Sequence, residues 1–294
     1  MRLSRLRWLK MSAPLARRWP GLFYKIALVG GWAAWKFRPR LRRNVTRNLL
    51  PLCDGDLDRA SREGVRVCQN IAQYYVDLST LRDRDFARFE RENLEFVNPE
   101  YIAGLNTPGP IVVVSSHTGN AEFAVQAVLS HGRRFVAIVE AQQPPEWSRY
   151  LLELRSAKGG KFFEADFRGV RASIEALRAG DVLGLMGDRD IQGTGIAAEL
   201  CGRTVKIPRG PWEFARRTNA LVMPVFASRR HNDRFRVFLN EPFHMEVTDD
   251  AERDIRVAAT RWARLLETHL RRDPGQWVVL EDFWNVHGCT EARK

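Results

Sequence analysis

Short apolar runs alternate with amphipathic segments along the middle of the chain. Apolar runs bounded by polar turns are typical of buried strands, and apolar positions spaced three and four apart are typical of helices. Strands are predicted at residues 111–115, 135–139, 182–186 and 221–226, with a charged strand at 234–239. Helices are predicted at residues 121–131, 145–157, 170–179 and 209–218. This alternation predicts an α/β fold, a mostly parallel central sheet flanked by helices.

Two longer amphipathic helices are predicted outside this alternating region, at residues 56–80 and 250–272. An acidic connector follows the first to about residue 109, and an aromatic run at 276–280 follows the second. The chain has no internal repeat and no low-complexity linker. We therefore expect one α/β domain over residues 51–294, preceded by a helical arm over residues 1–50.

The predicted arm differs sharply from the rest of the chain in charge. It holds thirteen basic residues and no acidic ones, while the whole chain of 294 residues has a net charge of +12. It also holds four of the nine tryptophans, a residue that favours the boundary between lipid headgroups and acyl chains. Its longest uncharged run, from Ile26 to Trp35, is too short to span a bilayer. The arm is therefore predicted to lie on an anionic membrane surface.

Other interpretations of the arm and of the cysteines have less support. A nucleic-acid partner is not expected, because the chain lacks zinc-finger spacing and an RNP-type aromatic strand. A signal peptide is disfavoured by the poor cleavage site and by the arginines that follow. The four cysteines form no C-x-x-C pair, which indicates neither a disulfide framework nor a zinc site. A reducing, cytoplasm-facing location fits this pattern.

The strongest candidate for chemistry is His117, which follows the first predicted strand directly. In open α/β sheets ligands bind beyond the carboxyl ends of the strands, so His117 would lie in the site. Glu122 follows five residues later, in the first turn of a helix with Asn120 as its N-cap. We expect the Glu122 carboxylate to hold one imidazole nitrogen while the other faces the substrate. His117 would then act as a general base, without a serine or cysteine nucleophile.

Two further segments place charged residues beside this candidate base. Asp188, Arg189 and Asp190 follow the strand at 182–186 directly. Arg189 is either locked in a structural salt bridge or free to clamp a phosphate or a carbonyl group. Arg209 and Gly210 open a helix whose backbone N–H groups can bind an anion. These segments are expected to converge on one substrate-binding site.

Several familiar catalytic devices are missing from the sequence. Ser115 and Ser116 precede His117 but form no G-x-S-x-G elbow, so we interpret them as turn residues. The other histidines have no metal-ligand spacing, and neither a P-loop nor a G-x-G-x-x-G after a strand occurs. No metal and no cofactor is therefore expected.

The ordered set of these motifs resembles the bacterial lipid A biosynthesis acyltransferases, over roughly residues 40–283. That family belongs to the glycerolipid acyltransferase superfamily and is similar to the mycobacterial mannoside acyltransferases. The motifs that carry the resemblance are His117-x4-Glu122, Gly187-Asp188-Arg189-Asp190, the turn from Glu199 to Gly202, Pro208-Arg209-Gly210-Pro211 and Pro274-Gly275-Gln276-Trp277.

The resemblance implies a peripheral enzyme on the cytoplasmic face of the inner membrane. Such an enzyme moves a fatty acyl chain from an acyl carrier protein or coenzyme A thioester to a hydroxyl of a lipid A precursor or related glycolipid. The resemblance makes His117 the general base and Glu122 its partner, and gives Arg189 a role in holding the donor carbonyl or an acceptor phosphate. Leu200 and Cys201 stand where many members have two phenylalanines, so the acyl pocket is expected to differ.

Alternatives from other classes remain open at the level of sequence. The same scaffold can serve a catalytically silent protein that binds lipid on a membrane surface, and water can replace the acceptor in a hydrolase. Within the acyltransferases, a lysophospholipid or a phosphatidylinositol mannoside is an alternative acceptor. A nucleic-acid binder that uses the basic arm is the remaining rival, and its binding would survive the loss of His117.

Overall fold

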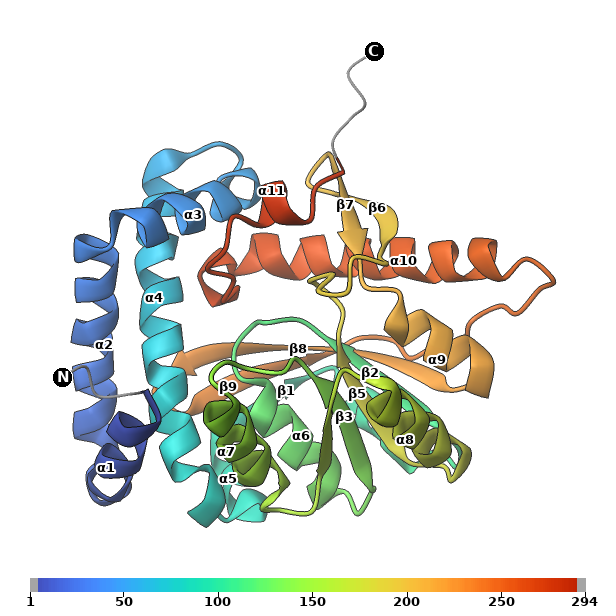
Figure 1. The fold of residues 1–294 in the computed structure, drawn as a ribbon, viewed down its shortest axis with the longest axis horizontal. Helices are drawn as coiled ribbons and strands as arrows, with labels where there is room; N and C mark the ends of the chain where they lie inside the picture. The colour runs from blue at the N-terminus through green and yellow to red at the C-terminus, as the bar shows by residue number, and fades with distance from the viewer. Residues whose placement is uncertain (1–4, 290–294) are drawn as a thin grey trace.

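A seven-stranded sheet forms the centre of the computed structural model, which describes residues 5–289 (Figure 1). Across the sheet the strands are β1 (Leu94–Val97), β9 (Arg234–Leu239), β8 (Leu221–His231), β2 (Ile111–Ser115), β5 (Val182–Met186), β3 (Phe135–Val139) and β4 (Lys161–Glu164). Neighbouring strands are parallel except for β8 and β9, which are antiparallel. The predicted α/β fold with a mostly parallel sheet is confirmed.

The helices agree closely with the predicted segments. Those of the alternating region are α6 (Ala121–Ser130), α7 (Pro145–Ser156), α8 (Phe167–Arg178) and α9 (Gly210–Thr218). The two long helices are α4 (Leu57–Thr80) and α10 (Ala251–Arg272). Asp56, Asp166 and Asp250 cap the starts of α4, α8 and α10 by accepting a hydrogen bond from a backbone N–H three residues on.

The two faces of the sheet contribute to two different cores, as the period of two along a strand requires. Val112 and Val114 of β2 pack into one core with residues of α8, α9 and α10. Ile111 and Val113 pack into the other, which includes residues of α6 and of the 3-10 segment η3 (Pro99–Asn106). Burial on both faces explains why the central strands are continuous apolar runs.

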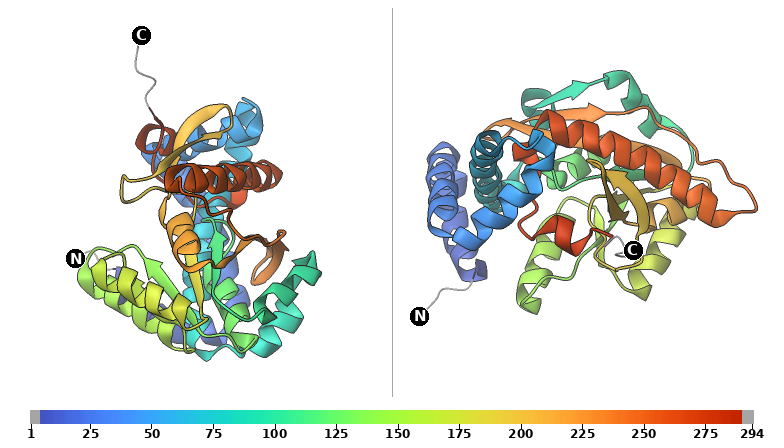
Figure 2. Two further views of the ribbon diagram at one scale, coloured as in Figure 1. Left: turned by 90° about the vertical axis from the view of Figure 1, so that its right-hand side faces the viewer. Right: turned by 90° about the horizontal axis from the view of Figure 1, so that it is seen from above.

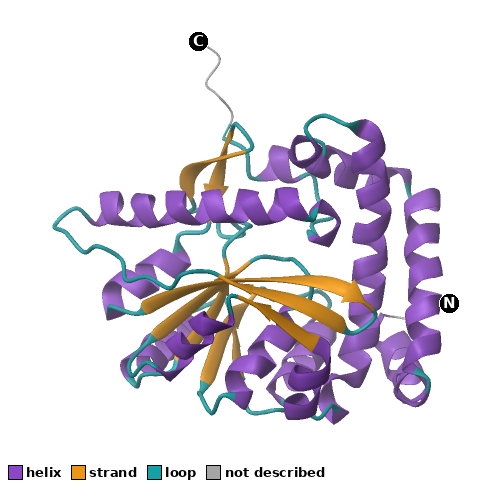
Figure 3. Ribbon diagram, turned by 180° about the vertical axis from the view of Figure 1, so that it is seen from behind, coloured by secondary structure: helices purple, strands orange, loops and turns teal. Residues whose placement is uncertain are grey.

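The N-terminal helices pack against the body of the protein at one end of the sheet (Figures 1 and 3). They are α1 (Arg5–Arg18), α2 (Pro20–Phe37) and α3 (Pro39–Leu49). A Cβ at Gly31 of α2 would lie 2.5 Å from the Cα of Gln69, so glycine allows α2 to approach α4 closely. Trp35 of α2 is buried in the same core as Val112 and Val114. The first four residues of the predicted arm, Arg2 among them, lie outside the described residues.

Several elements escaped the sequence patterns. The expected connector before residue 109 contains α5 (Phe86–Asn93), β1 and η3, and β4 was not predicted. Strands β6 (Ile196–Leu200) and β7 (Arg203–Ile207) form a separate hairpin, coloured gold in Figure 2, that packs on α10. Of the predicted turn from Glu199 to Gly202, only Cys201 and Gly202 form the turn that joins them, both with positive φ, whereas Glu199 and Leu200 belong to β6. Strand β8 continues to His231, five residues beyond the predicted end, because it pairs with β9 over this length and the buried Ser228 and Arg229 are bound to Asp273 and Asp77.

The C-terminal segment after α10 returns to the carboxyl end of β2. The described part ends with η4 (Pro274–Gln276) and the short helix α11 (Phe283–Val286). The aromatic run at 276–280 contributes a single bridge, between Thr118 and Trp277. It thereby lies directly beside the turn that follows β2.

Candidate active site

His117 lies in the turn between β2 and α6, and Asp188 lies just beyond β5. These strands are parallel neighbours, and Ser115 is in register with Met186, so the residues that follow each strand meet. The His117 Nδ1 atom lies 2.8 Å from Asp188 Oδ1, and the His117 backbone N–H donates to Oδ2 at 3.1 Å. The sheet register therefore brings together two residues that are 71 positions apart.

The environment of Asp188 keeps its carboxyl group ionised. The side chain has no exposed surface, and Trp277 donates its indole N–H to Oδ2 at 2.9 Å. Burial alone would raise the pKa of Asp188, but the charge of His117 and the hydrogen bonds from His117 and Trp277 lower it below its usual value. An ionised carboxylate only accepts, so Nδ1 of His117 carries a proton and Nε2 is the basic nitrogen.

Glu122 differs from its expected position. The partner of His117 at Nδ1 is Asp188, and Glu122 Oε1 instead accepts hydrogen bonds from the Tyr74 hydroxyl and from Arg155 Nε, each at 2.8 Å. Glu122 is in the first turn of α6, where its side chain meets α4 and α7 instead of the turn that holds His117. The pairing expected from the sequence is therefore corrected to His117 with Asp188.

A large groove opens at the carboxyl ends of β2 and β5. Its volume is about 1370 Å³. The predicted site residues that line it are His117, Glu122, Arg189, Asp190, Arg209 and Gly210. Asp188 is buried next to His117, so the structure brings all seven predicted residues to one site. The predicted convergence of the charged segments is thus present.

Of the two interpretations left open for Arg189, the structure contains the salt bridge. The guanidinium donates from Nε and Nη2 to the two carboxylate oxygens of Glu281, at 2.7 and 2.8 Å. Hydrogen bonds from His287 and Arg189 lower the pKa of Glu281 to about 2. Arg209 is likewise paired, with Glu213 and Glu252. Both arginines nevertheless line the groove, where a ligand can exchange with or add to these partners.

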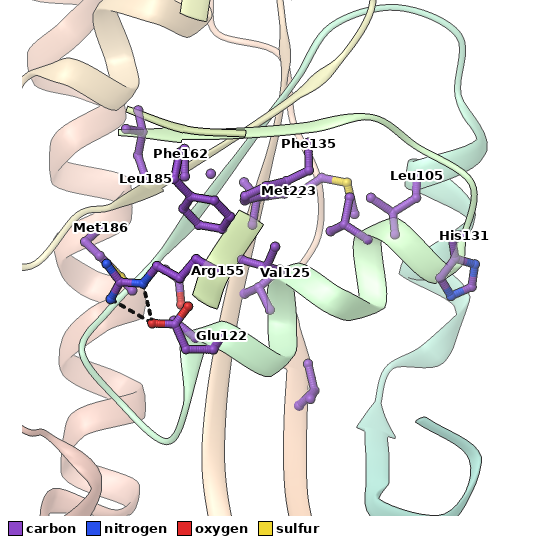
Figure 4. Close-up of a pocket in the computed structure, with 18 of the residues that line it drawn as sticks. Leu105, Glu122, Val125, His131, Phe135, Arg155, Phe162, Leu185, Met186 and Met223 are labelled. Atoms are coloured by element: carbon purple, nitrogen blue, oxygen red, sulfur yellow. Dashed lines mark hydrogen bonds and ion pairs between the residues drawn. The ribbon is translucent and has the colours of Figure 1, made fainter. Parts of the chain in front are cut away.

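A narrow apolar cavity of about 130 Å³ continues from the groove along α6 (Figure 4). Groove and cavity share seven lining residues, among them Glu122, Arg155 and Met186. The Glu122–Arg155 pair stands at one end of the cavity, and Leu105 and His131 stand at the other. Between these ends the lining is almost entirely apolar. The arrangement combines a polar groove, a histidine paired with a buried carboxylate, and an adjoining apolar space that can accept a hydrocarbon group.

Tyr74, Arg155 and Glu281 are site residues that the sequence reasoning missed. Trp277 was noted in the aromatic run at 276–280 and in a motif of the resemblance, but without a role in the site. The one local signal for Arg155 is its spacing from Trp147 and Leu151, which puts a charged residue on the apolar face of a helix. None of the missed residues follows a buried strand directly.

Two searches of the described residues, 5–289, gave negative results. No group of three or more His, Cys, Asp or Glu side chains in this range is placed to hold a metal ion. None of the helices in the same range is both long enough and apolar enough to cross a bilayer.

The chain is similar to known acyltransferases. It is 24% identical over 265 residues to the phosphatidylinositol mannoside acyltransferase of Mycolicibacterium smegmatis, which covers 86% of this chain and 82% of that protein. It is 25% identical over 227 residues to the phosphatidylinositol mannoside acyltransferase of Mycobacterium tuberculosis, covering 74% of this chain and 67% of that protein. A crystal structure of the 1-acyl-sn-glycerophosphate acyltransferase of Thermotoga maritima matches 78% of this chain and 98% of that chain, at 16% identity and a TM-score of 0.36.

The family match covers most of the molecule. The family described as bacterial lipid A biosynthesis acyltransferase matches residues 19–285, from the start of α2 to α11, and includes both His117 and Asp188. The resemblance seen in the ordered motifs is confirmed by this match, and so is the expectation that the chain is an acyltransferase. This chain belongs to the bacterial lipid A biosynthesis acyltransferase family.

Proposed function

We propose that this acyltransferase moves a fatty acyl chain from a thioester to a sugar hydroxyl of a glycolipid, with His117 as the general base and Asp188 as its orienting partner. The observation that carries the proposal is the 2.8 Å contact between His117 Nδ1 and the buried Asp188 carboxylate. This contact fixes the tautomer that leaves Nε2 free to take a proton. It does so at the edge of a groove that joins an apolar cavity.

The transfer needs one proton to move twice. His117 Nε2 removes the proton of the acceptor hydroxyl while the hydroxyl oxygen attacks the thioester carbonyl carbon, which gives a tetrahedral oxyanion. The carbon–sulfur bond then breaks, and the imidazolium returns the proton to the leaving thiolate. Products are the ester and a free thiol. General-base assistance of this kind contributes roughly 10²- to 10⁴-fold in rate. Asp188 stabilises the imidazolium that exists between the two steps.

The acyl chain of the donor occupies the apolar cavity along α6. Burial of each methylene group contributes about 0.8 kcal/mol, so even a few carbons in the cavity anchor the donor. Glu122 then has a binding role: with Tyr74 it holds Arg155 where the groove meets the cavity. This replaces the expected direct support of His117 by Glu122.

The groove binds the polar parts of donor and acceptor. Arg189 and Asp190 line the groove together with His117, and at the start of α9 a phosphate that displaces Glu213 or Glu252 would meet the Arg209 guanidinium and the Gly210 N–H. In both donors, acyl carrier protein and coenzyme A, a phosphate is attached to the end of the pantetheine arm opposite to the thioester. A lipid A precursor and a phosphatidylinositol mannoside are the two acceptors to be tested first, because the family and the relatives carry those names.

The outer face of α2 and the arginines of α3 attach the enzyme to the anionic cytoplasmic surface of the inner membrane. Leu22, Ile26 and Val29 follow helical spacing on α2 and are 54%, 51% and 65% exposed. The exposed basic residues at the start of α3 are Arg38, Arg40, Arg42 and Arg43. Vesicle flotation tests this directly: Ile26→Asp should release the protein from anionic vesicles, whereas binding that survives both Ile26→Asp and high salt would contradict the attachment.

The central experiment is acyl transfer in detergent micelles. Acyl carrier protein and coenzyme A thioesters serve as donors, and the two glycolipids and a lysophospholipid serve as acceptors. His117→Ala should lose most of the rate with the preferred pair, while His244→Ala, at an exposed position outside the groove, should keep it. Equal rates for wild type and His117→Ala would refute the assigned base. Vesicle binding without any transfer would favour a silent lipid-binding protein.

A further inference from the structure

Behind the turn that holds His117 lies a buried polar network centred on Asp77 of α4. The Asp77 side chain is almost completely buried and accepts hydrogen bonds from three partners. Asn120 Nδ2 donates to Oδ2 at 2.7 Å, and the Tyr24 hydroxyl donates to Oδ1 at 2.6 Å. The third partner is the guanidinium of Arg229 on β8, which forms an ion pair with the carboxylate. Arg229 thus supplies the charge that a buried carboxylate needs.

Asn120 connects this network to the catalytic turn. Its Oδ1 accepts the backbone N–H of Glu122 at 3.0 Å and so caps the start of α6, while its Nδ2 reaches Asp77. Only two residues separate Asn120 from His117. The turn is also pressed against β8, because a Cβ at Gly119 would lie 2.6 Å from the carbonyl oxygen of Ala227. Asp77 is therefore the side chain that fixes the end of the turn opposite to the His117–Asp188 contact.

Tyr24 comes from α2, the helix whose outer face is proposed to lie on the membrane. Its side chain points inward and is buried, whereas Leu22 and Ile26 are exposed. Burial raises the pKa of Tyr24 far above its usual value, so the hydroxyl stays protonated and donates to Asp77. A chain of two hydrogen bonds, Tyr24 to Asp77 and Asn120 to Asp77, thus connects the inner face of α2 to the turn that carries the base.

We infer that Asp77 is a positioning residue for acyl transfer, which sets the place of His117 through Asn120, and that Tyr24 makes this placement depend on α2. The inference rests on the proposed function, because it assigns a purpose to the turn only if His117 is the base. Displacing a catalytic group by about 1 Å can cost on the order of 10²-fold in rate, so a support of this kind affects the reaction without touching the substrate. The N-terminal helices are then part of the catalytic machinery as well as an attachment.

Two conservative variants separate positioning from general stability. Asn120→Ser keeps an oxygen that can cap α6, but its short side chain loses the contact with Asp77. Tyr24→Phe removes one hydroxyl and leaves the ring in place. Tyr101→Phe is the matched control, since Tyr101 lies in η3 and lines neither groove nor cavity. All three are assayed in micelles below their unfolding temperatures, with kcat and KM for the acyl donor measured separately.

The expected result is a loss in kcat at nearly constant KM. Asn120→Ser should lower kcat on the order of tenfold to a hundredfold and Tyr24→Phe about threefold to tenfold, because each leaves the turn less constrained. The double variant should fall no further than Asn120→Ser alone, since both changes break the same connection. Tyr101→Phe should match wild type.

The outcomes distinguish this inference from the proposed function. Transfer by wild type with unchanged kcat in both variants, or lower unfolding temperatures with unchanged kcat, would overturn the role of Asp77 and leave His117 as the base. Additive losses in the double variant would overturn the connection through Tyr24. An inactive wild type would instead contradict the proposed function itself, and the role of Asp77 with it.

Discussion

Replacing Asp188 by asparagine tests the proposed mechanism most sharply, because the change removes a charge and almost no volume. The carboxylate accepts from three donors: the imidazole and backbone N–H groups of His117 and the indole N–H of Trp277. An amide offers one oxygen and one NH₂ group, so at least one of these donors faces another donor. A buried donor left unpaired costs about 1 to 3 kcal/mol in the free energy of unfolding.

The loss in catalysis follows from the same contact. A hydrogen bond to a charged group contributes about 1.5 to 3 kcal/mol, and Asp188→Asn gives up this stabilisation of the imidazolium. The expected fall in kcat is therefore about tenfold to a hundredfold, with KM unchanged. Should the NH₂ group face Nδ1, the proton of the ring moves to Nε2, the base is lost, and the fall approaches 10⁴-fold.

The assay is steady-state acyl transfer, with His117→Ala as the lower limit of the rate. Asp181→Asn provides a matched control, since Asp181 precedes the same strand at its opposite end and pairs with Arg134. It should keep the wild-type kcat. A wild-type kcat for Asp188→Asn in a folded protein would refute the reasoning, because the buried charge would then contribute nothing to the reaction.

Three other predictions concern stability. Glu122→Ala should lower the free energy of unfolding by about 3 kcal/mol, since it leaves Arg155 buried without its carboxylate, and Glu122→Gln should lose less; urea denaturation measures both. Burial, with a smaller contribution from Arg272, lowers the pKa of His269 from 6.5 to about 4. The unfolded chain therefore takes up this proton at higher pH than the folded protein does. As the pH falls from 6.5 to about 4, the free energy of unfolding should decrease by up to roughly 3 kcal/mol. Urea titrations across this pH range should show that His269→Gln removes this decrease. Gly119→Ala should unfold at a lower temperature and transfer more slowly, because φ is +60° and the added Cβ would overlap the Ala227 carbonyl.

The central strands were predictable because they are buried on both faces. Strands β2, β3 and β5 begin and end at the predicted residues, since each is an apolar run bounded by polar residues. The hairpin of β6 and β7 was not predicted, because residues 196–200 read Ile-Ala-Ala-Glu-Leu, and alanine and glutamate are uncommon in strands and break up the apolar run. Its packing on α10 and not its own pattern makes it a hairpin.

Only those features of the site that depend on neighbouring residues in the sequence could be predicted. His117 and Asp188 were found because each follows a buried strand, where parallel sheets gather functional side chains. Their pairing was not found, because it depends on the order of strands in the sheet, which places β5 next to β2. Glu122 looked like the partner because it is close in sequence. In the structure, however, the first turn of α6 directs the Glu122 side chain to Tyr74 and Arg155 and not to His117.

The contacts of the C-terminal segment have a consequence for the order in which the enzyme becomes active. Val278 N–H donates to the His117 carbonyl at 2.8 Å, and Trp277 donates to Asp188, so residues near the end of the chain complete a turn formed far earlier. Ribosomes make the chain from its N-terminus, and contacts of such long sequence separation form late. We therefore expect the proposed site to stay incomplete during synthesis until Trp277 and Val278 have left the ribosome, so a chain that stops before them should transfer no acyl groups.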